Sequence, residues 1–353
     1  MQAAPLIPAP DAIPIAAGWL EALLLVTFIV HILLVNAVLG GTLVCAARSL
    51  VHSKTLAVKN MGKALPSLFA LAVNFGVAPL LFIQMLYGHY LYTSSILMAT
   101  YWISVIFLAI TAYYSLYVAA GRYGTAPKFS AAFFLSAAAM LGIGFIMSNN
   151  MTLMLKPHVW SAYFTSPDGT FLHLDDPSVA LRFLHAGVAS IAVGGLVLTI
   201  VARQTIAAKN ISVSMREERL GFSIFIVATL IQVMVGTALF FAQPEHIRAL
   251  FTGGSEFHTG LFLIGLSFVA MLLFQAAAHN IIGTLATLVF TVGIMAGIRA
   301  LIRKAMLAPY GGFAALPVQP EYSSFILFAT ALCFGLMAIG YMLKLAFRKP
   351  EDV

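Results

Sequence analysis

The sequence contains little charge. Asp, Glu, Lys and Arg together make up 9% of its 353 residues, whereas 61% of the residues are hydrophobic, and the mean hydropathy is +0.98. This composition cannot supply the polar surface that a soluble domain needs, which argues against a soluble globular protein. It predicts a polytopic membrane protein, whose solvent is the lipid bilayer.

Cysteine and tryptophan are also scarce. The two cysteines, Cys45 and Cys333, both lie in apolar runs, and no C-x-x-C-H motif occurs, so neither disulfides nor covalently attached c-type haem are expected. The three tryptophans, Trp19, Trp102 and Trp160, are scattered and do not form the tryptophan-rich segment of a haem exporter or lyase. The first residues have no basic region, so we expect no signal peptide.

Long apolar runs recur along the chain. Because backbone polar groups must be satisfied internally in lipid, and because the runs do not alternate with a period of two, we predict about nine transmembrane helices in one all-α bundle. The predicted spans are 17–47, 65–94, 97–120, 129–150, 179–202, 219–242, 257–278, 281–303 and 322–346. The segments between them are short, so residues 1–353 are expected to form one integral domain, with tails at 1–16 and 347–353.

Basic residues predict the orientation. Most Lys and Arg residues fall within 48–63, 122–128, 203–219 and 344–349, which lie on one side of a nine-span arrangement. The positive-inside rule then places the N-terminal tail outside and the C-terminal tail in the cytoplasm, as expected for a multi-pass protein of a bacterial inner membrane. The net charge of +7 follows from this topology and implies no nucleic-acid partner.

Four histidines are expected in the outer half of the bilayer: His31, His89, His185 and His258. At 1.5 Å per residue, His31 lies roughly 15 Å below the outer end of its helix, and His185 roughly 12 Å below the outer end of another. Neutral imidazole is the usual axial ligand of b-type haem, and helix bundles hold such ligands on facing helices. A single buried histidine is as often bonded to a neighbouring helix or part of a proton path. The set of four, with few carboxylates nearby, favours haem.

Several cations lie on the outer side, against the positive-inside trend. They are Lys156, Arg182, Arg248, Arg299 and Arg303. Cations at this level would pair with haem propionates, although contact with phospholipid headgroups explains them nearly as well. We take Arg182, Arg248 and Arg299 as cofactor-binding candidates.

Five segments occur in the order of a known family's helices: "FIVHILLVNAVLGG", "FGVAPLLFIQMLYGHYLYTSS", "NNMTLMLKPHVW", "PSVALRFLHAGVASIAVGG" and "MREERLGFSIFIVATLIQVMVGTALFFAQPEHIRALFTGG". They resemble segments of subunit I of the cytochrome bd oxidase superfamily, over roughly residues 20–255. The resemblance implies that His31 binds the haem nearest the first helix and that His185 is an axial ligand of a low-spin haem b. It also adds Gln84 and Met154 to the cofactor-binding candidates.

The chain departs from this family at several positions. Gln84 stands where the family has a glutamate, and Leu263 stands where its methionine ligand is expected, which leaves His258 or Met271 as substitutes. The third predicted helix has no carboxylates, and the long quinol-binding loop after "QPEHIR" is absent. The chain therefore lacks the groups that serve the oxygen site in the family that it resembles, and it lacks that family's quinol-binding loop.

The sequence therefore predicts a membrane haem b subunit of a respiratory electron-transfer complex, with two or more haems near the periplasmic face. His185 with His258 would hold one haem, and His31 with His89 a second. Other membrane subunits and a periplasmic c-type cytochrome are the expected partners, with quinone left open. Two alternatives remain. One is a divergent terminal oxidase that reduces oxygen or another small oxidant, and the other is a haem-free transporter or membrane scaffold.

Overall fold

The computed structural model describes residues 6–51, 55–121, 129–165, 167–206, 211–312 and 316–346. Helix is the dominant structure throughout these ranges, where the only bridge of β type joins Ile13 to Val318. The elements are α1 (Ala17–Leu50), α2 (Leu56–Leu97), α3 (Ala99–Gly121), α4 (Phe129–Met154), η2 (Pro157–Phe164), α5 (Pro177–Ile206), α6 (Ile211–Phe241), α7 (Glu245–Ala249), η3 (Leu250–Gly254), α8 (Glu256–Ala277), α9 (Ile281–Leu307), η4 (Ala308–Tyr310) and α10 (Tyr322–Ala346).

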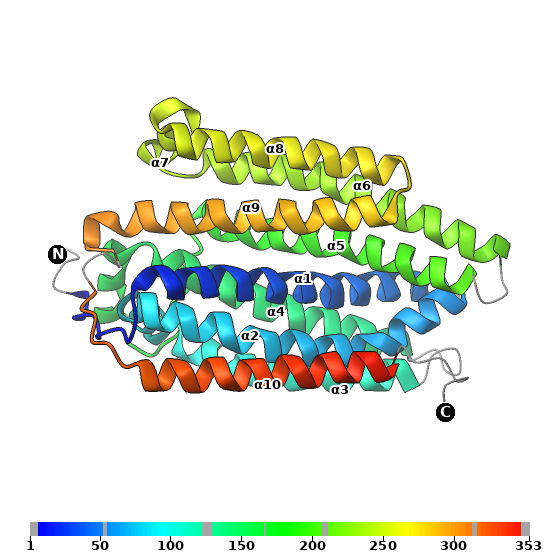
Figure 1. Cartoon of the computed structure of the whole chain (residues 1–353), viewed down its shortest axis with the longest axis horizontal. Coiled ribbons are helices and arrows are strands. Elements are labelled where there is room, and N and C mark those ends of the chain that lie inside the picture. Colours follow the sequence, from blue (N-terminus) through cyan, green and yellow to red (C-terminus); the bar gives the residue numbers. More distant parts are fainter. Residues whose placement is uncertain are drawn as a thin grey trace.

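The long helices lie side by side along the long axis of the molecule (Figure 1). Within the described ranges, eight of them are long and apolar enough to cross a membrane: α1, α2, α3, α4, α5, α6, α8 and α9. The shorter apolar run Ile326–Met342 lies in α10. This confirms the predicted all-α, multi-pass membrane bundle. Each of the nine predicted spans lies almost entirely in one long helix, with differences of one or two residues at the ends of three of them. The count of nine crossings and their orientation remain predictions.

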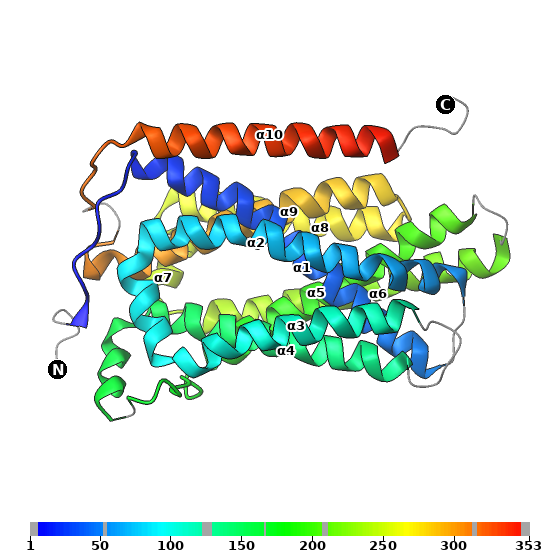
Figure 2. The same ribbon diagram turned by 90° about the horizontal axis from the view of Figure 1, so that it is seen from below.

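Helix α1 occupies the middle of the bundle and packs against α2, α4, α5 and α9. The most extensive pairings beyond these are α5 with α6, α3 with α4 and α8 with α9. Helix α10 lies at the edge of the bundle in both views (Figures 1 and 2). One of its contacts is the ring of Phe328, which meets Phe82 of α2 edge-on at 5.6 Å.

Small residues allow α1 and α5 to approach each other closely. A Cβ atom on Gly40 of α1 would overlap the carbonyl oxygen of Ser190, and a Cβ on Gly194 would overlap the backbone of Gly40. At the same crossing, Ser190 Oγ donates a hydrogen bond of 2.9 Å to Asn36 Oδ1. Glycine permits this backbone approach in membrane helices, and a polar bond adds specificity to it.

Ion pairs join the helices at both ends of the bundle. At the end where α1 terminates, Arg48 pairs with Glu217 of α6, and Arg203 of α5 pairs with Glu218 at 2.8 Å. At the opposite end, Lys304 of α9 lies 2.6 Å from Glu21 of α1. The bundle is therefore fastened by charge outside its apolar middle, where water or headgroups reduce the cost of ionisation.

Helix α2 bends near its C-terminal end, which is predicted to face outward. Its backbone leaves helical geometry at Tyr87 (φ −133°, ψ 23°). Pro66 and Pro79 also lie inside the helix, where each removes a helical hydrogen bond in the turn before it. His89 therefore lies beyond the bend, whereas the part of α2 that faces the middle of α1 lies before it.

Candidate functional site

His31 of α1 is held against α2 by a specific bond. Its Nδ1 lies 2.9 Å from the carbonyl oxygen of Ala72, and its ring lies against Gly76, where a Cβ would come within 2.7 Å of Cε1. A carbonyl oxygen can only accept a hydrogen bond, so Nδ1 carries the proton and the neutral ring keeps its lone pair on Nε2. Histidines that bind metals are oriented in this way, with the second ring nitrogen bonded to a carbonyl or carboxylate.

His185 of α5 faces α6. Its ring packs against Gly236, where a Cβ would lie 3.1 Å from Cε1. Its Nδ1 is buried and has no hydrogen-bond partner among the described residues, and the same holds for Oε1 of Gln232, one turn away from Gly236 on α6. Unpaired buried polar atoms are costly and call for a specific explanation.

The two histidines implied by the family resemblance are turned toward different helices. The ring of His31 is directed to α2 and that of His185 to α6, although their parent helices α1 and α5 pack on each other. The arrangement therefore provides two separate imidazole positions, and it does not place both rings at one iron.

The structure does not bring His89 to His31. From Gly76, which His31 touches, helix α2 advances about 20 Å before His89. The ring of His89 instead lies 4.0 Å from that of Tyr90, centroid to centroid. The two rings therefore lie at different levels along α2.

His258 lies in the first turn of α8. Its Nδ1 is 2.8 Å from Oγ of Ser255, and its ring meets the edge of Phe251 at 5.2 Å. Helix α8 packs on α6 and α9, and no hydrogen bond or ring contact joins His258 to His185 in the part of the chain that the structure describes. The pairing of these two residues at one haem remains a prediction.

Three of the cofactor-binding candidates converge at the end of the bundle where α4 and α9 terminate and α5 begins, the end predicted to face outward. Met154 of α4, Arg182 of α5 and Arg299 of α9 line the same small hollow, which Arg303 also borders. Arg299 stacks over the ring of Phe28 with 4.6 Å between Cζ and the centroid. Arg303 stacks over Tyr87 at the same distance, so aromatic faces hold both guanidinium groups.

The other two candidates lie apart from this hollow. Gln84 is half-buried on α2, and Arg248 of α7 lies 6.0 Å from the ring of Phe241. Arg248 Nε is buried without a hydrogen-bond partner among the described residues.

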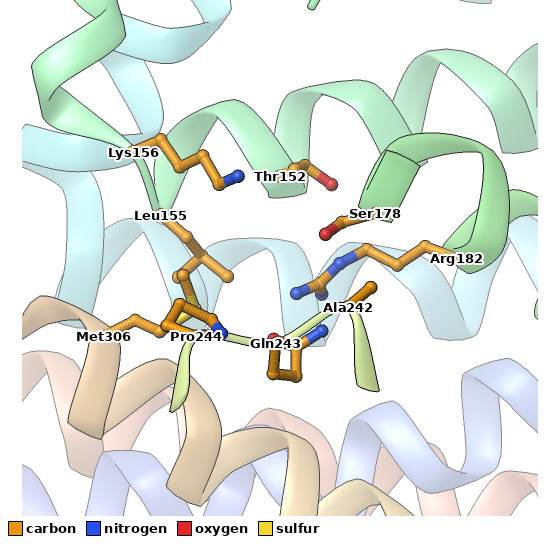
Figure 3. Close-up of a pocket in the computed structure, with 9 residues that line it drawn as sticks. All are labelled: Thr152, Leu155, Lys156, Ser178, Arg182, Ala242, Gln243, Pro244 and Met306. Carbon is orange, nitrogen blue, oxygen red and sulfur yellow. The ribbon is translucent and has the colours of Figure 1, made fainter. Parts of the chain in front are cut away.

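A cavity of about 160 Å³ (Figure 3) adjoins the hollow and shares Leu155 and Arg182 with it. It lies between the C-terminal ends of α4, α6 and α9 and the N-terminal end of α5. Lysine, arginine, hydroxyl and amide groups converge around it. Its lining is Thr152, Leu155, Lys156, Ser178, Arg182, Ala242, Gln243, Pro244 and Met306.

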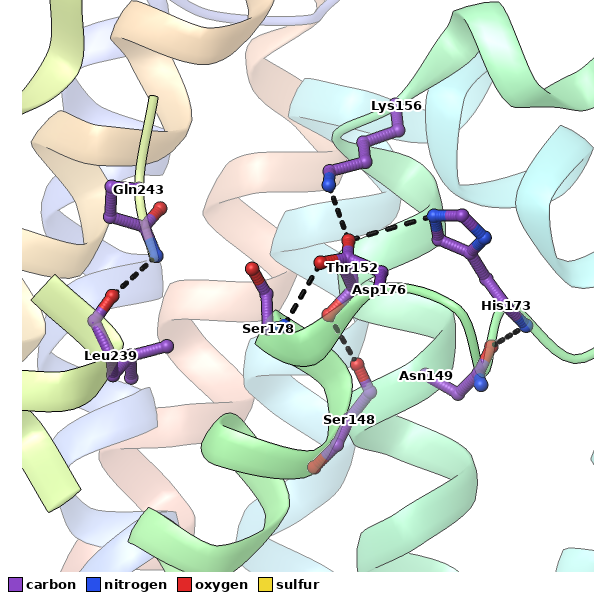
Figure 4. A network of polar contacts seen from close by, with 9 residues as sticks. All are labelled: Ser148, Asn149, Thr152, Lys156, His173, Asp176, Ser178, Leu239 and Gln243. Atoms are coloured by element: carbon purple, nitrogen blue, oxygen red, sulfur yellow. Dashed lines mark hydrogen bonds and ion pairs between the residues drawn. The ribbon is translucent and has the colours of Figure 1, made fainter. Parts of the chain in front are cut away.

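Asp176 is the acidic centre of a polar network beside this cavity (Figure 4). Lys156 forms an ion pair with it, the backbone N–H of Ser178 donates to it at 2.9 Å, and His173 Nε2 lies 3.6 Å away. Burial alone raises the pKa of Asp176, but the hydrogen bonds from Lys156 and Ser178 outweigh burial and hold this pKa below its usual value. Burial lowers the pKa of His173, and Asp176 only partly offsets this.

The linings of the hollow and the cavity contain Lys156, Arg182, Arg299 and Arg303 and no carboxylate. Asp176 is matched by Lys156, and Glu21 is matched by Lys304. Arg182, by contrast, has no ion pair or hydrogen bond with any residue that the structure describes, and its Nε is buried. A buried cation needs an anionic partner, so this region has the electrostatic character of an anion-binding site.

The sequence predicts Arg182, Arg299 and Met154 as candidates, but no pattern in it predicts that Asp176 and Gln243 converge on the same region. Asp176 precedes one predicted helix and Gln243 follows another. Which helix ends are neighbours depends on tertiary packing, which no local pattern reports.

No protein-family model matches this chain, and no curated protein is significantly similar to it. The fold alone thus defines its class, that of an all-α, multi-pass membrane protein.

Proposed function

We propose that this protein is a haem b-binding subunit of a respiratory electron-transfer complex in the bacterial inner membrane, related in organisation to subunit I of cytochrome bd oxidases. The observation that carries the proposal is the bond between His31 Nδ1 and the Ala72 carbonyl oxygen. It leaves Nε2, with its lone pair, as the ligating atom in an apolar region where a histidine otherwise only adds cost.

The surroundings of His185 support a second haem. Its buried Nδ1 has no partner among the described residues, and Gly236 leaves open the space that a side chain would fill beside the ring. Arg182 lies one turn earlier on α5, so an imidazole and a guanidinium share one face of that helix. This is the spacing at which one helix could contact both the centre and the charged edge of a macrocycle.

The donor set fits haem. Among the described residues no three His, Cys, Asp or Glu side chains come together as ligands of a metal ion, and a haem needs only one or two protein ligands. When bound, haem supplies one-electron chemistry. The protein's contribution is to hold the imidazoles, exclude water with apolar helices and neutralise propionates with Arg182 and Arg299.

The remaining features of the proposal come from the sequence. The outward position of the N-terminal tail follows from the distribution of Lys and Arg. A site near the periplasmic face would exchange electrons with a c-type cytochrome or a quinone, and the edge helix α10 offers an apolar surface to other membrane subunits.

The test is quantitation of haem by pyridine haemochrome and reduced-minus-oxidised spectra on the purified wild-type protein and on His31→Ala and His185→Ala. Each substitution is expected to remove one haem equivalent without unfolding the protein. His246→Ala is the matched control, because His246 is exposed on α7.

A wild-type protein without haem, or unchanged haem content in both variants, would refute the proposal. Addition of carbon monoxide to the reduced protein then separates a relay from an oxidase, since only an iron with an open position binds it.

A further inference from the structure

The cavity between the outer ends of α4, α5, α6 and α9 is separate from the positions of His31 and His185. We propose that it binds a phosphate-type oxyanion, supplied either by a phospholipid headgroup or by free inorganic phosphate. The inference shares Arg182 with the proposed contact to a haem propionate, but it is argued only from the side chains that line the cavity.

Charge is the first argument. The guanidinium of Arg182 points into the cavity (Figure 3), its Nε is buried without a hydrogen-bond partner among the described residues, and it forms no ion pair there. Asp176 attracts this guanidinium electrostatically, but that carboxylate already pairs with Lys156. Burial of an incompletely compensated guanidinium is unfavourable. An anion in the cavity would supply the missing charge.

The shape of the donor set is the second argument. A guanidinium presents a planar fork of N–H groups that matches the oxygens of phosphate, and a lysine adds a point charge. Lys156 reaches into the same space from the end of α4, and the hydroxyl groups of Thr152 and Ser178 face it (Figure 3). Arg182 of α5 and Lys156 of the segment after α4 therefore present N–H donors to a single volume, whereas the Thr152 hydroxyl already donates to the Ser148 carbonyl oxygen at 2.8 Å.

Asp176 does not block an anion here. Its carboxylate is matched by Lys156 and by the backbone N–H of Ser178, and it does not line the cavity. The nearby Arg299 and Arg303 add further positive charge through the adjoining hollow, which shares Arg182 with the cavity.

Size and location are the third argument. The cavity, at about 160 Å³, is roughly ten times the volume that a single ordered water requires. This is room for a tetrahedral oxyanion with some bound water. The cavity lies at the helix ends, which is the level of lipid phosphates in a bilayer.

The experiment uses the full-length protein in nonionic detergent without phospholipid. Thermal unfolding is followed while inorganic phosphate replaces chloride at constant ionic strength. A ligand that binds only the folded state raises the midpoint temperature with concentration. We expect such a rise for the wild type and at least about tenfold weaker phosphate binding for Arg182→Gln.

Two further variants make the result specific. Ala242→Leu fills the cavity but leaves Arg182 intact, so it should also abolish the phosphate effect. Arg219→Gln removes an exposed arginine at the opposite end of α6 and should respond like the wild type. If Arg182→Gln does not fold, Ala242→Leu alone decides.

A second arm identifies the source. The titration is repeated in vesicles of phosphatidylglycerol. If added phosphate no longer stabilises the wild type in these vesicles, the lipid headgroup already occupies the cavity and is the ligand. If added phosphate still stabilises the wild type, the ligand is the free anion. The proposal is overturned if phosphate and chloride stabilise the wild type equally in detergent, or if Ala242→Leu responds like the wild type. Haem content, measured in the same samples, reports the proposed function separately.

Discussion

The imidazole of His31 occupies the space that a side chain at Gly76 would take, since a Cβ at Gly76 would lie 2.7 Å from Cε1 and 2.9 Å from Nδ1. Gly76 lies in ordinary helical backbone, so its conformation does not require glycine. The requirement comes from His31 of α1, whose ring leaves no room for a larger side chain at this position. The same contact holds the ring where Nδ1 can donate to the Ala72 carbonyl.

Gly76→Ala is therefore expected to displace His31 and to break its bond to Ala72. Overpacking of this kind costs about 1–3 kcal/mol, and the haem that we assign to His31 should be lost or show a shifted spectrum. The measurement is the reduced-minus-oxidised spectrum with the thermal midpoint. Gly297→Ala is the matched control, because a Cβ there meets nothing within 4 Å. Equal spectra for both variants would refute the assigned role of Gly76.

Gly40→Ala is expected to be the more damaging substitution for the fold. The new methyl group would overlap the Ser190 carbonyl, which belongs to backbone and cannot rotate away, so α1 and α5 would have to separate. We expect little folded protein in detergent, measured by size-exclusion chromatography and thermal unfolding. Gly187→Ala, on α5 in open space, should behave like the wild type. Normal yield of Gly40→Ala would contradict the close crossing.

Much of the fold could be predicted from the sequence, because lipid imposes one strong rule. Each apolar run must be a helix, and each of the nine runs lies almost entirely in one long helix. The second span, predicted from residue 65, lies inside α2, which begins earlier, at Leu56. The reason is that a helix continues past the membrane surface when polar residues favour it, whereas hydropathy marks only the buried part.

The site was less predictable. His31 and His185 could be identified as buried imidazoles, and Arg182 and Arg299 as cations on the unexpected side. The separation of His31 from His89 depends on which turn of α2 meets α1, and the gathering of Arg182 with Met154 depends on which helix ends are neighbours. Both are properties of packing between elements distant in sequence, and helical periodicity carries no information about them.

The pair formed by Arg48 and Glu217 is expected to fasten α1 to α6. The side chain of Glu217 is 3% exposed, so removing one partner leaves a buried charge, which typically costs 3–5 kcal/mol. Arg48→Gln should therefore lower the midpoint temperature clearly, because it leaves the buried Glu217 carboxylate without this partner, and the double variant with Glu217→Gln should recover part of the loss. A double-mutant cycle of thermal midpoints measures this coupling. Additive losses would contradict a direct pair.

Acidification should weaken the outer end of the bundle in two steps. The pKa of His173 is lowered in the folded protein by burial, so the unfolded state binds the proton first and stability falls as the pH drops below about 6.5. The pKa of Asp176 is also lowered, here by Lys156 and Ser178 against the opposing effect of burial. Its ionised form thus contributes stability above about pH 4, and this contribution is lost as the pH falls through the folded-state pKa.

Thermal midpoints measured from pH 8 to pH 3 test both steps. In His173→Gln, which cannot titrate, the decline below about pH 6.5 should be reduced. Asp176→Asn leaves Lys156 without its carboxylate, so its midpoint should be lower at neutral pH and should lack the wild-type decline below about pH 4. If Asp176→Asn retains the full acid decline, other carboxylates cause it, and Asp176 does not stabilise the folded protein through its charge.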